Sequence, residues 1–336
     1  MYRVLVVGGG SIGERHARCF INTGRAEVAL CETKPERRDE MAARYALSAT
    51  FDDFDGIDLS RFDAAVICLP PRLHVPYARR VIDAGCHAFI EKPLSLDLAG
   101  VPELGRTAEQ KGLTIGVAFL LRATRIAKVV KDEIDSGRAG EILDITCVCG
   151  YDHRVARPDY RSTYAVSKAM GGGAIPDQLS HRANLIQWFL GPVRQVVASY
   201  ERLAWEDADV EDTLSALLRF RDSSAMCNIH VSMWHPCQTN RVTLSSNDKQ
   251  VICDNSLEKV GILHRETGEW NWTPVPAGKR DAKGQVDEPF VLEANNFLDA
   301  VEGKAEILCS LEEAAHTVAI CMAAAESGRL GRAVEI

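Results

Sequence analysis

The sequence lacks long apolar segments, and it lacks an excess of positive charge. No apolar run approaches the ~18–20 residues that a membrane-spanning helix requires, so we expect no membrane partner. The apolar run at the N-terminus is interrupted by Gly8 and is too short for a signal peptide, so we expect none. The 39 Lys and Arg residues are outnumbered by 47 Asp and Glu residues, which gives a net charge of −8. We expect no nucleic-acid partner, because a mildly acidic chain does not attract phosphate backbones.

Cysteine motifs that hold metals or disulfide frameworks are also missing. The chain has eleven cysteines, an odd number, and contains no C-x-x-C motif. No cluster of His, Cys and acidic residues has zinc-like spacing, so we expect no metal. Many cysteines lie within apolar runs, for example Cys68 and Cys227. We therefore expect reduced core cysteines and a cytoplasmic location.

The length and composition are typical of a globular protein with about two domains. The chain has 336 residues, of which 46% are apolar, 26% charged and 7% aromatic. These proportions exclude a collagen-like, fibrous or wholly disordered chain.

Residues 1–120 alternate apolar runs of strand length with segments of helical spacing. The predicted strands are residues 3–7, 27–31, 64–69, 88–90 and 114–119. The predicted helices are residues 12–22, 36–45, 75–84 and 98–111. This alternation predicts an α/β domain of the Rossmann type, a doubly wound parallel sheet with helices on both faces.

The pattern changes near residue 120, and no flexible linker marks the change. Helices are predicted over 121–136 and near 176–190, with a strand over 142–149 and a long polar loop between them. Strand-like runs joined by short polar turns follow at 193–200, 213–220, 225–232, 241–246 and 250–254. Helices return at 290–301 and 311–327. The sequence thus predicts a second α/β domain over 121–336 with a mostly antiparallel sheet, and the final helix is a candidate to pack back on the first domain.

A glycine-rich turn follows the first predicted strand and precedes the first predicted helix. The segment Gly8-Gly9-Gly10-Ser11-Ile12-Gly13 fits G-x-G-x-x-G in the strand–turn–helix context that this motif needs. The first glycine permits a tight turn, the second the approach of a pyrophosphate, and the third close packing of helix and strand. The N-terminus of the helix then offers N–H groups and a partial positive charge to the phosphates. The motif predicts cofactor-binding residues at Gly8, Gly10, Ser11, Ile12 and Gly13.

Glu32 ends the second predicted strand, nineteen residues after Gly13. A carboxylate at this position accepts hydrogen bonds from the ribose hydroxyls of a dinucleotide and repels a 2′-phosphate, which favours NAD over NADP. Lys34, Arg37 and Arg38 can offset that repulsion, so NADP stays an alternative.

Further polar motifs lie at the ends of later elements. The segment 69–74 reads LPPRLH and lies at the end of the predicted strand 64–69. Glu91-Lys92-Pro93 follows the next predicted strand, 88–90. A glycine run at 171–173 precedes Asp177 and His181, which lie four residues apart and share one face of a helix. Together with the glycine turn and residues 84–94 (AGCHAFIEKPL) and 137–145 (GRAGEILDI), these residues resemble the Gfo/Idh/MocA family of oxidoreductases over nearly the whole chain.

The resemblance implies an N-terminal Rossmann domain and a C-terminal substrate-binding and oligomerisation domain with an open sheet. It implies that NAD(P) serves to oxidise or reduce sugars, cyclic polyols and related compounds. The implied cofactor-binding residues beyond the glycine turn and Glu32 are Leu69, Pro70, His74, Glu91 and Lys92. The implied catalytic residues are Lys92, Asp177 and His181. This sequence departs from the family pattern at Asn184, where an aspartate is usual, and at Arg72, where a smaller polar residue is usual.

Oxidation of an alcohol needs an acceptor for the hydroxyl proton. We hypothesise that His181 is the general base, that Asp177 orients it or binds a neighbouring hydroxyl, and that Lys92 stabilises the developing alkoxide. Lys92 is the alternative proton carrier, because burial can lower a lysine pKa toward neutrality.

The loop over 152–168 is basic in an otherwise acidic chain. It holds three arginines and two tyrosines, and Arg122 lies near the start of the following domain. Arginine forks suit carboxylates and phosphates, so we hypothesise a sugar substrate with an acidic or nucleotide group. A solvated basic loop or a subunit contact explains the charges equally well. The candidate substrate-binding residues are Arg122, Tyr160, Arg161 and Tyr164.

Two other functional classes stay open. One is a cofactor-binding sensor without catalysis, and the other is a reductase of a non-sugar carbonyl or imine. In each case we expect a homodimer or homotetramer.

Overall fold

The computed structural model describes residues 1–281 and 284–336, and these form two compact units. The first unit combines Met1–Ala123 with Gly278–Ala315, and the second combines Thr124–Ala277 with His316–Ile336. The change of pattern near residue 120 assigns Gly278–Ala315 to the second domain, but this segment packs with the first unit. All eleven cysteines lie within the described residues, and none forms a disulfide.

The first unit contains a six-stranded sheet in which every strand pair is parallel. The strand order is β3-β2-β1-β4-β5-β6, the order of a doubly wound dinucleotide-binding fold. The strands are β1 Tyr2–Val7, β2 Ala26–Cys31, β3 Ala49–Phe51, β4 Ala64–Ile67, β5 His87–Glu91 and β6 Ile115–Ala118. The predicted parallel sheet is confirmed. Strand β3 was not predicted, because its three residues are largely exposed and form no apolar run.

Helices cover this sheet, and its core lies between them and the strands. They are α1 Ser11–Asn22, α2 Pro35–Arg44, α3 His74–Asp83, α4 Val101–Gln110 and α8 Glu288–Val301, with short 3₁₀ turns at Leu59–Arg61, Pro71–Leu73 and Leu120–Ala123. Four successive residues of β1, Val4 to Val7, are buried, as expected for a strand covered on both faces. Helix α8 contributes Phe297, whose ring lies 5.0 Å from that of Phe89 and 6.3 Å from that of Phe20. This aromatic packing places Gly278–Ala315 in the first unit.

The second unit contains a nine-stranded sheet that is mostly antiparallel. The strand order is β14-β13-β12-β11-β7-β10-β9-β8-β15, and only β7 and β10 are parallel neighbours among the described strands. The strands are β7 Asp144–Asp152, β8 Val193–Glu201, β9 Thr213–Phe220, β10 Met226–Ser232, β11 Trp234–Ser245, β12 Lys249–Asp254, β13 Lys259–His264, β14 Trp270–Pro274 and β15 Val334–Glu335. Buried and exposed residues alternate along β9 and β10, so one face of the sheet is open, as predicted.

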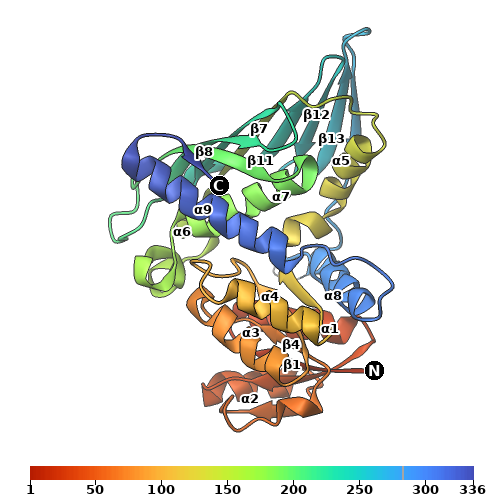
Figure 1. The fold of residues 1–336 in the computed structure, drawn as a ribbon, viewed down its shortest axis with the longest axis vertical. Coiled ribbons are helices and arrows are strands. Elements are labelled where there is room, and N and C mark those ends of the chain that lie inside the picture. The colour runs from red at the N-terminus through yellow and green to blue at the C-terminus, as the bar shows by residue number, and fades with distance from the viewer. Residues whose placement is uncertain (282–283) are drawn as a thin grey trace. The chain divides into compact units, whose positions relative to one another are not determined.

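The helices of the second unit are α5 Arg125–Asp135, α6 His153–Ala156, α7 Ser180–Leu190 and most of α9 Leu311–Leu330 (Figure 1). The single helix predicted over 121–136 is wrong at its start. Residues Leu120–Ala123 form a 3₁₀ turn, and α5 begins after Thr124, whose hydroxyl caps the helix by accepting from the N–H of Ala127. A threonine at this position ends one helical segment and starts the next.

Candidate functional site

The glycine turn between β1 and α1 is possible only without side chains at two positions. Gly8 has a φ of +97°, and a Cβ there would lie 2.5 Å from the carbonyl oxygen of Cys68. A Cβ on Gly13 would lie 1.8 Å from the carbonyl oxygen of Gly8. Gly10 differs, because no described heavy atom lies within 4 Å of the Cβ that it lacks. The turn is therefore packed at Gly8 and Gly13 and leaves open space at Gly10.

The open space lies at the N-terminus of a helix. Helix α1 begins at Ser11, followed by Ile12, and Gly10 is its N-cap residue. Because its N-cap residue is a glycine, this terminus has no capping side chain at that position. An uncapped helix N-terminus is a site for a phosphate group. Leu69 and Pro70 follow β4, the neighbour of β1, at the same carboxyl edge of the sheet, where open parallel sheets bind ligands.

Glu32 lies directly after β2 and is joined to the glycine turn. Its Oε2 accepts a hydrogen bond from the N–H of Gly9 at 2.6 Å, and its Oε1 accepts one from the N–H of Lys34 at 2.8 Å. Oε1 also accepts from the hydroxyl of Thr33 at 3.4 Å, whereas Oε2 can accept a second hydrogen bond. Glu32 therefore stabilises the turn and keeps the capacity to accept from a hydroxyl group.

Glu91 has a buried partner that the sequence reasoning missed. The Oε1 of Glu91 lies 2.7 Å from Nε2 of His16, and its Oε2 accepts from the N–H of Lys92 at 2.9 Å. His16 is fully buried, its ring meets those of Phe89 and Phe290 edge-on, and its Nδ1 has no hydrogen-bond partner among the described residues. The proton of a neutral ring then belongs on Nε2, where it is donated to Glu91. The position of His16 one turn after Gly13, beside buried Ala17, is a signal that could have identified it.

A second buried acid lies on α8. Glu293 is 3% exposed, and burial, together with the negative charge of Glu91, raises its pKa well above the usual value. The neutral form of Glu293 is therefore favoured more than in an exposed glutamic acid. Glu91 differs from it in having two hydrogen-bond partners, His16 and the N–H of Lys92.

His74 connects the two loops that follow β4 and β5. Its Nδ1 lies 2.9 Å from the carbonyl oxygen of Pro93, and its Nε2 lies 2.6 Å from that of Leu69. Burial lowers the pKa of His74, although both carbonyl groups favour a protonated ring. The peptide bond between Lys92 and Pro93 is cis. His74 thus holds the segments that carry Leu69 and Lys92 together, while its predicted contact with the cofactor stays a prediction.

In the second unit, Asp177 is held by two neighbouring side chains. It is 6% exposed, its Oδ1 accepts from the hydroxyl of Tyr164 at 2.9 Å, and its Oδ2 accepts from Nε2 of Gln178 at 2.8 Å. The same amide nitrogen donates to the hydroxyl of Tyr151 at 3.1 Å. Tyr164 was predicted as a site residue, whereas Gln178 and Tyr151 were missed.

Asp177 and His181 lie on consecutive helical segments. Asp177 is in a π-helical turn, Ile175–Leu179, and His181 is in the first turn of α7, where it is half-buried. The preceding glycine run permits close packing, because a Cβ on Gly172 would lie 2.3 Å from the carbonyl oxygen of Tyr164. A π-helical turn often occurs at functional sites.

Two other predicted substrate-binding residues, Tyr160 and Arg161, contact neighbouring side chains of the second unit. Tyr160 is 5% exposed and packs on Trp205, with 5.7 Å between ring centroids. Arg161 is exposed and pairs with Asp207 at 2.8 Å.

Arg122 belongs to the first unit and is 1% exposed. Its guanidinium donates to the carbonyl oxygen of Leu308 at 2.7 Å and to Glu313 at 2.6 Å. A substrate role for Arg122, Tyr160 or Arg161 stays a prediction.

No group of three or more His, Cys, Asp or Glu side chains in the described part of the chain is arranged to hold a metal ion. Within the same residues, no helix combines the length and apolar character needed to cross a membrane.

The fold and the glycine turn define a dinucleotide-binding protein, and comparisons with known proteins give its family. Residues 2–119 match the model described as "Oxidoreductase family, NAD-binding Rossmann fold", and residues 127–251 match the Gfo/Idh/MocA C-terminal domain. The chain belongs to the Gfo/Idh/MocA family of NAD-binding oxidoreductases, and the resemblance seen in the sequence is confirmed.

Three similar proteins are named as dehydrogenases. The chain is 24% identical to an inositol 2-dehydrogenase of Rhizobium meliloti, with 98% of each chain covered. It is 24% identical to a D-glucoside 3-dehydrogenase of Escherichia coli, with 67% of this chain and 68% of the relative covered. The structure of the WlbA dehydrogenase from Bordetella pertussis, in complex with NADH and UDP-GlcNAcA, has a TM-score of 0.83 and 25% identity, with 100% of this chain and 98% of that chain covered.

The two kinds of glycine in the turn predict different effects of substitution. We expect Gly13→Ala to lower the free energy of unfolding by about 2–3 kcal/mol, because its methyl group overlaps a backbone carbonyl. We expect Gly10→Ala to change stability by about 0.5 kcal/mol or less but to weaken NADH binding about tenfold, since its methyl group fills the open space. Urea unfolding and titration of NADH fluorescence measure the two effects. Equal stability of the two variants would contradict this account of the turn.

The buried pair of His16 and Glu91 predicts a second stability effect. We expect His16→Phe to lower the free energy of unfolding by about 3 kcal/mol, because it leaves a buried carboxylate oxygen without its donor. His16→Gln keeps an N–H donor at a similar reach, so we expect a loss of about 1 kcal/mol. Urea unfolding of both variants tests the difference. A loss of the same size in both would show that the hydrogen bond is not the cause.

Proposed function

We propose that this protein is an NAD-dependent dehydrogenase or reductase that transfers hydride between the nicotinamide and the CH–OH carbon of a sugar or polyol. The observation that carries the proposal is the open space at Gly10, the glycine N-cap of α1, beside the carboxylate of Glu32 at the carboxyl edge of a doubly wound sheet. The related inositol and D-glucoside dehydrogenases support the substrate class.

The described residues fit a bound NAD. The space at Gly10 and the first residues of α1, Ser11 and Ile12, suit the pyrophosphate. Glu32 keeps acceptor capacity for the adenosine ribose hydroxyls. NAD supplies the hydride acceptor when it is bound, and the protein orients the reacting groups and controls their protons.

We assign the proton to His181 and charge stabilisation to Lys92. In alcohol oxidation, His181 removes the hydroxyl proton, and the ammonium group of Lys92 stabilises the developing alkoxide. Asp177 is the orienting group, a role that its hydrogen bonds from Tyr164 and Gln178 support because they hold both carboxylate oxygens. In the reduction direction the proton moves back from His181 to the substrate oxygen.

The charges of the loop over 152–168 favour a neutral substrate. Arg154 is bound by Asp152 at 2.7 Å, and Arg161 is bound by Asp207 at 2.8 Å. An arginine already paired with a carboxylate attracts a second anion less strongly, since part of its charge is offset. We therefore place neutral sugars and polyols ahead of sugar acids and nucleotide sugars.

Turnover with a panel of substrates and two variants tests the function. We expect NAD-dependent oxidation of at least one neutral sugar or polyol in preference to sugar acids and nucleotide sugars. On the best substrate, we expect Lys92→Ala and His181→Ala to lower kcat by about 100-fold or more, the range of a lost general base or charge stabiliser. NADH fluorescence measures whether cofactor binding survives in each variant.

Three results would contradict this proposal in different ways. Tight NAD binding without turnover on any substrate would indicate a cofactor-binding sensor. Reduction only of a non-sugar carbonyl or imine would change the substrate class. Turnover near wild type in both variants would remove Lys92 and His181 from the mechanism.

We also propose that the open face of the nine-stranded sheet forms a contact between copies of the chain. Apolar side chains are exposed there, among them Val197 at 41% and Met226 at 40%. We expect sedimentation to show a dimer or tetramer, and we expect Val197→Asp to shift it toward the monomer because it places a charge in the contact. A wild-type protein that sediments as a monomer would contradict this expectation.

A further inference from the structure

One face of helix α2 carries charges of both signs. Arg37, Glu40 and Arg44 lie three and four residues apart, so their side chains are neighbours along the helix. Glu40 pairs with Arg37 at 2.7 Å and also with Arg44. Such exposed pairs within one helix contribute little to stability or orientation.

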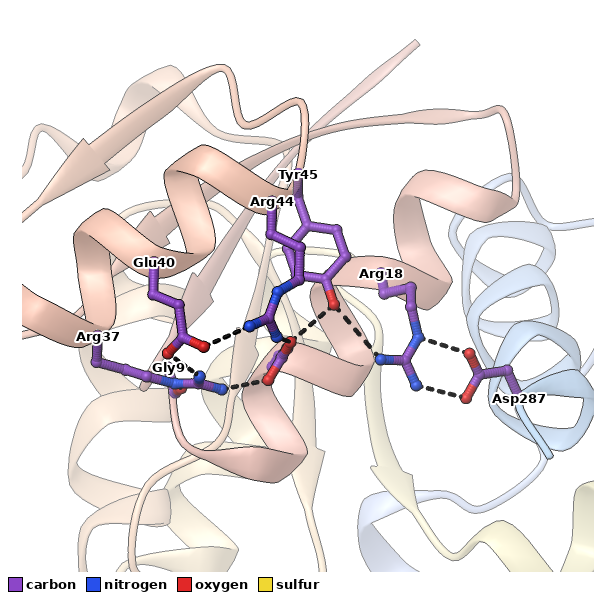
Figure 2. Close-up of polar contacts among 8 residues, drawn as sticks. Gly9, Arg18, Arg37, Glu40, Arg44, Tyr45 and Asp287 are labelled. Carbon is purple, nitrogen blue, oxygen red and sulfur yellow. Dashed lines mark hydrogen bonds and ion pairs between the residues drawn. The ribbon is translucent and has the colours of Figure 1, made fainter. Parts of the chain in front are cut away.

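A fourth charge comes from another helix. Glu14 lies in the first turn of α1, and Arg37, Arg44 and Tyr45 all donate to its carboxylate. One oxygen accepts from Arg37, and the other accepts from Arg44 and, at 2.8 Å, from the hydroxyl of Tyr45. Glu14 is thus the one acid that binds both arginines from outside their own helix in the network of Figure 2.

Glu14 holds these arginines more firmly than Glu40 does. The side chain of Glu14 is 13% exposed, whereas that of Glu40 is 47% exposed. Burial raises the pKa of Glu14, but hydrogen bonds from Arg37, Tyr45 and Arg44 outweigh this effect and lower the pKa to about 2. Glu14 is therefore an anion at neutral pH, and its ion pairs are less screened by solvent.

Tyr45 connects this network to a further ion pair, between Arg18 and Asp287. Arg18 binds both carboxylate oxygens of Asp287, at 2.6 and 2.7 Å, and lies 3.5 Å from the hydroxyl of Tyr45 (Figure 2). Asp287 directly precedes helix α8, so Tyr45, which donates to Glu14, is linked through Arg18 to the start of α8. A side chain held from several elements loses little further freedom on staying in place.

Arg37 lies beside the predicted ribose position. The Nε of Arg37 donates to the carbonyl oxygen of Gly9 at 2.6 Å. The backbone N–H of Gly9 in turn donates to the carboxylate of Glu32 at 2.6 Å. NADP differs from NAD by a phosphate on the ribose that Glu32 would face. A guanidinium group is a preferred ligand for such a phosphate. A 2′-phosphate that approaches Glu32 therefore also approaches Arg37.

We propose that Glu14 determines cofactor choice together with Glu32. By binding Arg37, Glu14 withholds its guanidinium group from the 2′-phosphate of NADP, while Glu32 repels that phosphate directly. The inference rests on the proposed NAD-dependent function and adds a specificity residue that does not itself contact the cofactor.

Direct binding of the two reduced cofactors to the purified protein tests the role of Glu14. The quantity to measure is the ratio of the NADPH and NADH dissociation constants, from titrations of nicotinamide fluorescence. We expect Glu14→Gln to shift this ratio toward NADPH by about tenfold, the effect of one or more charge-assisted hydrogen bonds. NADH affinity and thermal unfolding show whether the variant is folded.

Glu40→Gln is the matched control, since it removes the same charge from the same two arginines. We expect it to change the ratio by about twofold or less, because Glu14 still holds both side chains. An equal shift in both variants would overturn the proposal, since net charge alone would then explain it. An unchanged ratio in Glu14→Gln would overturn it as well.

Two arginine substitutions identify the group that is released. We expect Arg37→Ala to abolish the shift when combined with Glu14→Gln, whereas Arg38→Ala should not, because Arg38 binds the carbonyl oxygen of Glu32 at 2.8 Å. If the shift is lost when Glu14→Gln is combined with Arg38→Ala but not when it is combined with Arg37→Ala, the phosphate is bound by Arg38, and the proposal is overturned.

A further variant needs no substitution of Glu14. In the otherwise wild-type chain, we expect Arg37→Ala to leave the ratio unchanged within about twofold, since Arg37 is already withheld. A larger shift toward NADH would show that Arg37 already binds the phosphate and would overturn the role of Glu14. A wild-type protein that binds neither cofactor would instead overturn the proposed function.

Discussion

The close approach of helix α1 to strand β1 is the constraint on which the first unit depends. A Cβ at Gly13 would lie 1.8 Å from the carbonyl oxygen of Gly8, so the helix can start at this point only without a side chain there. This contact sets the position of the helix N-terminus at the carboxyl edge of the sheet. The positions of Glu32, which binds Gly9, and of Glu91, which meets His16 on the same helix, follow from it.

The charged groups around this helix have separate tasks. His16 faces inward and supplies a donor to Glu91, next to Lys92. Glu14 faces α2 and binds Arg37 and Arg44, of which Arg37 also donates to the carbonyl oxygen of Gly9 in the glycine turn. One short helix thus provides the terminus at the carboxyl edge of the sheet, a buried support for the Glu91-Lys92-Pro93 segment and a partner for the basic residues of α2.

The second unit shows a similar division between exposed and supporting residues. Asp177 is nearly buried and held by Tyr164 and Gln178, whereas His181 on the next turn is half-buried. The π-helical turn around Asp177 and the close packing at Gly172 could not be predicted, because helical periodicity does not distinguish a wide turn from an α-helical one. The spacing of Asp177 and His181 nevertheless indicated a helix there.

The sequence by itself determined the parallel sheet, the glycine turn, Glu32 after the second strand and the mostly antiparallel second sheet. These features depend on local order along the chain, such as apolar periodicity and glycine spacing. Only the tertiary structure decided that Gly278–Ala315 packs with the first unit, that His16 meets Glu91 and that Glu14 binds Arg37. These contacts join residues from 23 to more than 200 positions apart, and their partners are chosen by packing between elements, which local periodicity does not encode.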